Sequence, residues 1–359
     1  MANKLEIVPL NDWGFFHLPP RPCVIAGPCS AETEEQVLST AEGLKAVGIN
    51  VFRAGIWKPR THPGCFEGVG VPGLKWLQKV KAQYGMKVCT EVASSRHVFE
   101  CLKYGVDMVW LGARTTANPF LVQEIAEALR DTGLPVMVKN PVNPDIDLWI
   151  GALERLNREG INKIGVIHRG VSTSEKIKYR NAPQWEMAVE LRARYPEIPI
   201  FCDPSHIAGK REYLAELSQR AMDLGLDGLM IESHCDPSCA LSDAAQQLTP
   251  AALIALLEGL TVRDAATADE AFNEALSRLR AQIDVIDENL VKYLASRMKV
   301  SREIGELKKA GKVAIVQAGR WDAVLEKVRS GAVAAGIDPD FVVRIFNAIH
   351  DASVAEQNK

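Results

Sequence analysis

The sequence lacks long hydrophobic runs: none reaches the roughly 18 apolar residues that a membrane-spanning helix needs. Its first residues, MANKLEIVPLNDWGF, also lack the apolar core of a signal peptide. The formal net charge is only -3, so no excess of one sign attracts the chain to nucleic acid or to a membrane surface. We therefore expect a cytoplasmic protein that has neither nucleic acid nor membrane as a partner.

Cysteine is also scarce: eight cysteines at irregular positions in 359 residues are too few for a disulfide scaffold. Cys23 and Cys202 lie inside apolar runs, where a free cysteine packs as a small hydrophobe. His234, Cys235 and Cys239 could suggest a small zinc cluster, but no second cysteine pair exists to complete it. We expect the cysteines to be reduced.

Between residues 22 and 234, short apolar, β-rich runs alternate with segments of helical periodicity that close on glycine. Such alternation predicts a parallel sheet covered by helices. Eight units in about 250 residues match a (β/α)₈ barrel, with a doubly wound open sheet as the alternative on pattern alone. The eight runs are CVIAGPCS, NVFRAG, KVCTEV, MVWLGA, PVMVKN, KIGVIHRG, PIFCDPS and GLMIESH.

Polar residues stand at or just beyond the end of each expected strand, which favours the barrel. In a barrel these ends converge on one mouth, where active sites are built, whereas in an open sheet they would be strung along an edge. The residues concerned are Cys29, Arg53, Glu91, Arg114, Lys139, Arg169, His206 and Glu232.

After about residue 260 the strand-like runs vanish, so we predict two domains, 1–260 and 261–359. From Ala271 to Ala310 a near-heptad apolar stripe predicts one helix of roughly 40 residues, about 60 Å long. Shorter helices are expected around 320–329 and 338–357. A helix of that length cannot bury its stripe against so small a domain, so we expect an all-α three-helix unit that dimerises.

Four residues of the first domain form a candidate metal site. One thiol, one imidazole and two carboxylates suit a first-row dication such as Mn²⁺, Fe²⁺, Co²⁺ or Zn²⁺. The spacing is not that of a zinc finger, so only folding could assemble the site. These residues are Cys29, His206, Glu232 and Asp243.

Cations crowd the same predicted mouth. A single arginine at a strand end is more often a structural ion-pair partner, but six cations together repel one another unless anions share the space. Arginine binds phosphate and carboxylate through two hydrogen bonds, so a multiply charged anionic substrate is expected. The six are Arg53, Lys58, Arg60, Arg114, Lys139 and Arg169.

Over residues 20–258 the chain resembles the metal-dependent 3-deoxy-D-arabino-heptulosonate 7-phosphate (DAHP) synthases, in the branch close to the 3-deoxy-D-manno-octulosonate 8-phosphate (KDO8P) synthases. The resemblance rests on nine motifs in order: AGPCS, FRAG, KPRT, GART, KNP, HRG, DPSH, IESH and ALSD. It implies condensation of phosphoenolpyruvate with erythrose 4-phosphate and loss of phosphate. It also implies the four metal ligands above, with Mn²⁺ preferred and Co²⁺, Fe²⁺ and Zn²⁺ as alternatives.

The same resemblance assigns the substrate contacts. Groups around phosphoenolpyruvate would be Arg53, Lys58, Arg114, Lys139 and Arg169. Contacts to the aldose phosphate would be Arg60 and Thr61, with Asp203 near its hydroxyls. Candidates to handle the proton of the attacking water are Lys58, Glu91 and His234. The segment KPRT goes with erythrose phosphate, which argues against arabinose 5-phosphate as acceptor, although His62 departs from the small residue expected after it.

The predicted long helix carries cations at or beside its apolar stripe, which is costly unless they meet an anion. A register-setting residue in a dimer helix is the alternative. Ser353 and Gln357, four residues apart, share one face of the last helix. The candidate residues here are Arg280, Arg297, Lys308, Arg320, Ser353 and Gln357.

Residues 268–358 resemble the all-helical chorismate mutases through LRAQID, SR, GRW and ASVAEQ. The resemblance implies an intertwined homodimer, or a larger homo-oligomer, that rearranges chorismate to prephenate. Arg297, Lys308, Arg320 and Gln357 would hold the substrate, and Arg280 would come from the partner chain. Where the commoner pattern has acidic residues, this chain has Gln317 and Trp321.

Together the two resemblances imply a bifunctional enzyme of aromatic amino-acid biosynthesis. The barrel would use two substrates, phosphoenolpyruvate and erythrose 4-phosphate. The helical domain would use chorismate. As an alternative, the helical domain is an allosteric dimerisation unit that senses chorismate or prephenate. A KDO8P-synthase-like acceptor specificity is the other alternative.

Overall fold

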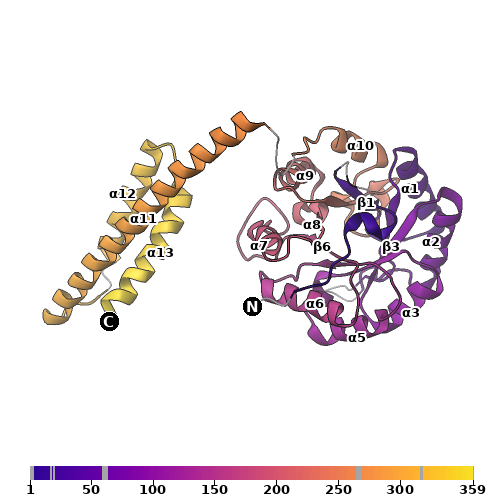
Figure 1. Ribbon diagram of the computed structural model, residues 1–359, viewed down its shortest axis with the longest axis horizontal. Coiled ribbons are helices and arrows are strands. Elements are labelled where there is room, and N and C mark those ends of the chain that lie inside the picture. Colours follow the sequence, from indigo (N-terminus) through magenta and orange to yellow (C-terminus); the bar gives the residue numbers. More distant parts are fainter. Residues whose placement is uncertain are drawn as a thin grey trace. The chain divides into compact units, whose positions relative to one another are not determined.

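The computed structural model describes residues 4–16, 18, 21–58, 64–263, 269–315 and 318–358. The chain divides into two compact units, Met1–Ala265 and Ala266–Lys359. Figure 1 shows a sheet surrounded by helices in the first unit and helices alone in the second.

Eight parallel strands form a closed barrel in which each strand pairs with the next along the chain and β8 pairs with β1. The predicted (β/α)₈ fold is therefore confirmed, and the open sheet is excluded. The strands are β1 (Cys23–Gly27), β2 (Val51–Arg53), β3 (Lys87–Val92), β4 (Met108–Leu111), β5 (Val136–Lys139), β6 (Ile164–His168), β7 (Ile200–Cys202) and β8 (Gly228–Glu232).

Helices cover the outside of the barrel (Figure 1). Many begin at a side chain that accepts a backbone N–H of the first turn, as Thr33, Ser94 and Asp145 do. The helices are α1 (Glu34–Ala46), α2 (Val71–Tyr84), α3 (Ser95–Lys103), α4 (Ala113–Thr116), α5 (Pro119–Leu129), α6 (Ile146–Arg158), α7 (Glu186–Arg194), α8 (Pro204–Ala208), α9 (Leu214–Asp223) and α10 (Pro250–Glu258), with 3₁₀ turns η1 (Leu10–Trp13), η2 (Arg211–Tyr213), η3 (Pro237–Cys239) and η4 (Ala244–Gln246).

Strand residues alternate between two apolar clusters, as the two faces of a barrel require. The inner cluster also contains Trp13 and Phe16 of the N-terminal segment, and the ring of Phe16 lies 5.6 Å from that of Phe201. Trp13 comes so close to β6 that a Cβ added at Gly165 would lie 3.3 Å from its ring. These side chains close the N-terminal end of the barrel with apolar groups.

On six of the strands, the residue two positions beyond the last inner apolar one lies at the C-terminal end of the barrel and is polar. The period of two in a strand therefore explains why side chains far apart in sequence converge. The successive pairs are Val51 and Arg53, Cys89 and Glu91, Met137 and Lys139, Ile167 and Arg169, Phe201 and Asp203, and Met230 and Glu232.

The second unit contains α11 (Glu270–Ala310), α12 (Ala318–Ala334) and α13 (Pro339–Asn358). The 41 residues of α11 span about 60 Å, as predicted. Helix α13 packs against both α11 and α12, and α12 is longer than the expected 320–329 because its Ala-rich continuation stays helical. Much of the apolar stripe of α11 is exposed, with Ile283, Ile286 and Leu290 each more than half accessible.

Within the described residues, no helix combines the length and the hydrophobicity needed to cross a membrane.

Candidate active sites

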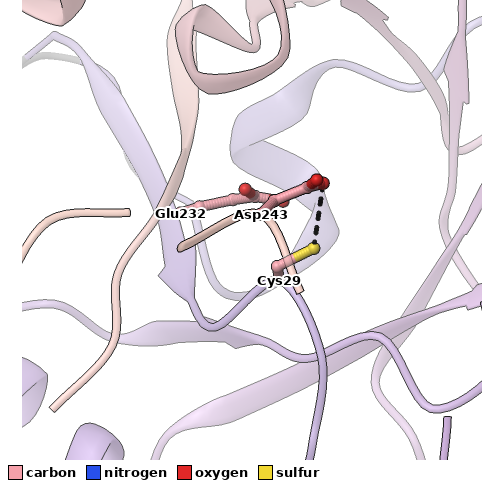
Figure 2. Close-up of side chains that lie close together, drawn as sticks. All are labelled: Cys29, Glu232 and Asp243. Atoms are coloured by element: carbon pink, nitrogen blue, oxygen red, sulfur yellow. Dashed lines mark hydrogen bonds between the residues drawn. The ribbon is translucent and has the colours of Figure 1, made fainter. Parts of the chain in front are cut away.

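Three of the four predicted metal ligands meet at the mouth of the barrel. Cys29 follows β1, Glu232 ends β8, and Asp243 lies in the loop between β8 and α10. One ligand atom of each residue lies within 4.8 Å of those of the other two. The Sγ of Cys29 lies 3.4 Å from Oδ2 of Asp243, which it faces in Figure 2. Cys29 and Glu232 are fully buried, so solvent does not reach these two members of the cluster.

The fourth predicted ligand, His206 on α8, lies at the border of this cluster. Its Nε2 is 3.8 Å from Oε1 of Glu232. Its Nδ1 is 2.7 Å from Oδ2 of Asp203, although the ring N–H does not align with that oxygen as a hydrogen bond. A carboxylate behind one ring nitrogen, with the other nitrogen directed at the site, is the usual arrangement around a histidine that binds metal.

The protonation states at the cluster follow from burial and from neighbouring charges. Burial, reinforced by Glu232, raises the pKa of the Cys29 thiol to about 12. Burial alone would also raise the pKa of Asp243, but Arg180, His206 and Lys58 outweigh it and hold that pKa at about 2. Likewise, His206 and Lys139 overcome burial and keep the pKa of Asp203 well below its ordinary value. By these shifts alone, the thiol is protonated and the carboxylates of Asp203 and Asp243 are ionised at neutral pH.

A pocket of about 380 Å³ opens next to the cluster and includes His206 and Asp243 in its wall. Most of the other side chains in its wall are charged or polar. Predicted residues in the wall are Lys58, Glu91, Arg114, Lys139 and Arg169, and residues that the sequence did not single out are Cys65, Ser172, Arg180 and Asn181.

Arg53 ends β2 and is almost completely buried. Its Nη2 is 3.2 Å from Oε1 of Glu232, and its guanidinium lies over the ring of Trp110, 5.0 Å from the centroid. The Nε and Nη1 atoms are buried and have no hydrogen-bond partner among the described residues. Buried donors of this kind are costly unless a further group accepts from them, and a bound anion would do so.

The cations around Arg53 lie close to one another. Burial lowers the pKa of Arg169 to about 10; Asp203 opposes the shift, and the charges of Arg180 and Arg114 add to it. Lys139 donates to Oδ2 of Asp203 at 2.7 Å. Among the described residues, five cations stand in the wall of this one pocket, which suits it to a polyanion: Lys58, Arg114, Lys139, Arg169 and Arg180.

Lys58 and Glu91 both stand in the pocket wall, and each is held there by different partners. The Nζ of Lys58 donates to the carbonyl oxygen of Cys29 at 3.0 Å and approaches its Sγ at 3.1 Å. Glu91 accepts the indole N–H of Trp110 at 3.0 Å. A Cβ at Gly112 would lie 2.2 Å from Oε1 of Glu91, so a larger residue there would displace this carboxylate from its present position.

In the second unit, four of the six predicted residues meet between α11 and α13. Arg297 donates to the hydroxyl of Ser353, and Lys308 donates to Oε1 of Gln357 at 3.3 Å. Lys308 also donates to the carbonyl oxygen of Ile315 at 2.5 Å. A Cβ at Gly305 would lie 2.8 Å from the Cα of Gln357, so this glycine permits the close approach of the two helices.

The other two predicted residues of this unit, Arg280 on α11 and Arg320 on α12, are exposed. The departure Trp321 stacks on His350 of α13, with ring centroids 3.9 Å apart and planes 20° from parallel. Gln317 lies outside the described residues.

The model of the DAHP synthetase I family matches residues 19–267, which is more than half of the chain. The chain belongs to this family. A second model, chorismate mutase type II, matches residues 279–358. Both resemblances predicted from motifs are thereby confirmed: the protein is an enzyme with a DAHP synthase barrel and a chorismate mutase domain.

Similar proteins include the phospho-2-dehydro-3-deoxyheptonate aldolase of Thermotoga maritima, 35% identical over 63% of this chain and 64% of that protein. The chain thus spans somewhat less than two thirds of that relative. The 2-dehydro-3-deoxyphosphooctonate aldolase of Trichlorobacter lovleyi is 30% identical over 67% of this chain and 92% of that protein. A crystal structure of the T. maritima DAHP synthase aligns with a TM-score of 0.63, at 31% identity, over 70% of this chain and 72% of that one.

Some residues of the synthase barrel lie where the motifs did not lead us to expect them. Asp203 is fully buried and contacts His206 and Lys139 instead of the pocket. His234 is also buried; its Nε2 lies 3.7 Å from Oε2 of Glu32, and it is not in the pocket wall. Arg60, Thr61 and His62 lie outside the described residues.

Two further residues of the barrel join the metal cluster to the pocket. Arg180 donates from Nη1 to Oδ1 of Asp243 and to Oε1 of Gln246, each at 3.1 Å. Gln246 in turn donates to Oε2 of Glu232 at 2.7 Å. The loop after β6 emerges at the mouth of the barrel, and this was the available signal for Arg180. No periodicity marks Gln246.

Proposed function

We propose that the protein is a bifunctional enzyme with domains 1–260 and 261–359. The barrel would condense phosphoenolpyruvate with erythrose 4-phosphate to give DAHP and phosphate, and the helical domain would convert chorismate to prephenate. The observation that supports the first activity most strongly is the cluster of Cys29, Glu232 and Asp243 beside a pocket lined by cations. Family membership supports both activities.

The donor set fits a divalent first-row metal. Thiolate, imidazole and carboxylate together suit Mn²⁺, Co²⁺, Fe²⁺ or Zn²⁺, and we favour Mn²⁺. Cys29, Glu232 and Asp243 would hold the ion together with His206, whose Nδ1 side is occupied by Asp203. Bound there, the ion would polarise the aldehyde carbonyl of the acceptor. Asp203 then has the role of orienting His206, a different role from contact with the acceptor hydroxyls.

Phosphoenolpyruvate would occupy the cationic part of the pocket. The unsatisfied donors of Arg53 and the ammonium of Lys139 suit one anionic group, and Arg114 and Arg169 suit the other. Held at both ends, the enol would present C3 to the aldehyde carbon, and this positioning replaces a bimolecular encounter with an effectively unimolecular step. Arg60 and Thr61 remain the proposed contacts of the acceptor phosphate.

Water must add at C2 of phosphoenolpyruvate before phosphate leaves, and its proton needs an acceptor. Lys58 and Glu91 are in the pocket wall, whereas His234 faces Glu32. We therefore favour Lys58 and Glu91 for proton handling. Burial alone would lower the pKa of Lys58, but the Cys29 sulfur that it contacts and the carboxylates of Glu232 and Glu91 hold that pKa above its ordinary value. Glu91 would accept the proton that the water loses on adding at C2, and Lys58 would give a proton to the alkoxide oxygen formed from the aldehyde.

In the helical domain, Arg297 and Lys308 are placed to bind carboxylate and ether oxygens, with Ser353 and Gln357 beside them. The rearrangement needs no nucleophile, only a site that holds the compact conformer and stabilises charge on the ether oxygen. We propose a homodimer in which Arg280 of one chain completes the pocket of the other. The exposed stripe of α11 supports this assembly.

The deciding experiment follows phosphoenolpyruvate consumption with erythrose 4-phosphate, in metal-free protein and after addition of Mn²⁺. Activity that depends on the metal would support the barrel function. Turnover with arabinose 5-phosphate instead would favour the alternative acceptor. The similarity to the 2-dehydro-3-deoxyphosphooctonate aldolase of T. lovleyi is the reason for testing it.

A second assay follows chorismate in the same preparation. Absence of mutase activity, together with synthase inhibition by prephenate, would favour the allosteric alternative for the helical domain.

A further inference from the structure

A buried amide joins the two loops that carry Cys29 and Asp243. The side chain of Gln247 is fully buried. Its Oε1 accepts the backbone N–H of Cys29 at 2.9 Å, and its Nε2 donates to the carbonyl oxygen of Ser242 at 2.8 Å. One side chain therefore fixes the backbone of one ligand and the residue directly before another.

The Asp243 backbone is in the left-handed region, with φ 48° and ψ 36°. A non-glycine residue adopts this conformation only at a cost, and it persists where surrounding contacts hold it. Here Arg211 donates to the carbonyl oxygens of Ala244 and Gln247, both at 2.7 Å. Arg211 thus holds the backbone that follows Asp243, and Gln247 holds the residue that precedes it.

A second contact runs parallel to the first. The hydroxyls of Ser30 and Ser242 touch each other, and both residues are buried. Each is a direct neighbour of a ligand, Cys29 in one case and Asp243 in the other. The two loops are therefore tied at two points on the side of the cluster away from the pocket.

The spacing that results is one that a single ion can bridge. The Sγ of Cys29 lies 3.4 Å from Oδ2 of Asp243. Metal–sulfur bonds of about 2.3 Å and metal–oxygen bonds of about 2.1 Å put adjacent ligand atoms roughly 3.1–3.6 Å apart. The separation of these two atoms falls within this range.

We propose that Gln247 is a positioning residue for the metal: it holds Cys29 and Asp243 at the spacing that one ion would bridge. This inference rests on the proposed metal site. Without the amide, the N–H of Cys29 and the carbonyl of Ser242 are left buried without these partners, and the loops separate to satisfy them with water. The ion must then draw the ligands together at the expense of its own affinity.

The test titrates metal-free protein with Co²⁺ and follows the thiolate-to-cobalt charge-transfer absorption, which reports the bond to Cys29. In Gln247→Ala we expect affinity to fall about 10- to 100-fold, as is usual for partners behind metal ligands, with weaker absorption per bound ion. Gln247→Glu keeps the acceptor for Cys29 but loses the donor to Ser242, so its loss should be smaller.

Asn157→Ala is the matched control. Its amide also joins two segments, accepting from the N–H of Glu6 at 3.0 Å and donating to the carbonyl oxygen of Glu6 at 2.8 Å. It lies on α6, outside the site, so Co²⁺ affinity should stay at the wild-type value. If Gln247→Ala does not fold, as judged by circular dichroism, Gln247→Glu carries the comparison.

Wild-type affinity and absorption in the folded Gln247 variants would overturn the positioning role while leaving the metal site intact. Absence of the thiolate absorption in the wild-type protein would instead overturn the metal site itself, and the positioning role with it.

Discussion

The barrel and the helical domain differ in how much of each candidate site one chain supplies. At the barrel mouth, Cys29, Arg53 and Glu232 are buried and fixed by contacts within the same chain. On α11, by contrast, only Ser301 and Gly305 are buried among its 41 residues. The comparison teaches that the fold of one chain organises the first site, whereas the helix that carries much of the second leaves most of its surface exposed, as the proposed homodimer would need.

Of the variants that test this difference between the two domains, we expect the largest effect on activity from Cys29→Ala. Loss of the thiolate should reduce the synthase rate by about 10²- to 10³-fold, the usual worth of one group that stabilises charge in a preorganised site. The mutase rate should be unchanged, because the two sites share no residue. Cys101→Ala, which removes another buried thiol on α3, is the control; a synthase that tolerates Cys29→Ala would refute the ligand assignment.

Arg297→Ala tests the helical side of the comparison. It should lower the mutase kcat by about 10²-fold and leave the synthase within about twofold of wild type. Arg302→Ala is matched to it, since Arg302 is also an α11 cation that contacts α13, through Glu356 at 2.8 Å. Equal losses of mutase activity in both variants would argue for a general effect on helix packing.

Metal affinity should change about tenfold per pH unit. The Cys29 thiol, with its pKa raised to about 12, holds its proton in the metal-free protein at neutral pH. Asp243, with a pKa of about 2, is already ionised. Binding as thiolate therefore releases one proton, so affinity rises with pH and falls as pH decreases.

Calorimetry in buffers of different ionisation enthalpy counts this proton. No proton release between about pH 6 and 8 would mean that the ion binds without the thiolate. The mutase step, which needs no metal, should show no corresponding dependence on added ion.

The smallest effect is expected for Gly305→Ala. The added Cβ would lie 2.8 Å from the Cα of Gln357, and overpacking costs about 1–3 kcal/mol, which the better helix propensity of alanine offsets by about 1 kcal/mol. Net destabilisation of the helical domain should appear as a lower Tm by calorimetry. Gly331→Ala on α12, where a Cβ meets nothing within 4 Å, should stabilise the same domain; the same sign in both variants would contradict the contact argument.

The sequence was sufficient for the barrel because the alternation of strand and helix is regular, and convergence of strand ends is a property of that fold. Cys29 and Glu232 could be paired across 200 residues for this reason. Asp203 and His234 were placed less well. Asp203 directly follows β7 and His234 lies two residues beyond β8. Whether such a side chain turns to the pocket or behind it depends on tertiary partners, His206 in one case and Glu32 in the other.

Loop residues were the least predictable. Arg180 and Gln247 reach the cluster through the paths of the β6–α7 and β8–α10 loops, and no periodic pattern encodes those paths. On α11 the stripe predicted the helix and its exposed face, and the spacing of Arg297 and Lys308 predicted one shared side. Their partners on α13 could be expected only through the family resemblance.

The apolar floor made by Trp13 and Phe16 has an electrostatic consequence. Apolar groups at the base of the barrel have a low dielectric constant. They concentrate the electric field of Arg53, Arg114, Lys139 and Arg169 at the open mouth of the barrel. A chain with a net charge of -3 can thus repel anions over much of its surface and still draw them to a single point. Capture of phosphorylated substrates by such steering should slow steeply as ionic strength rises.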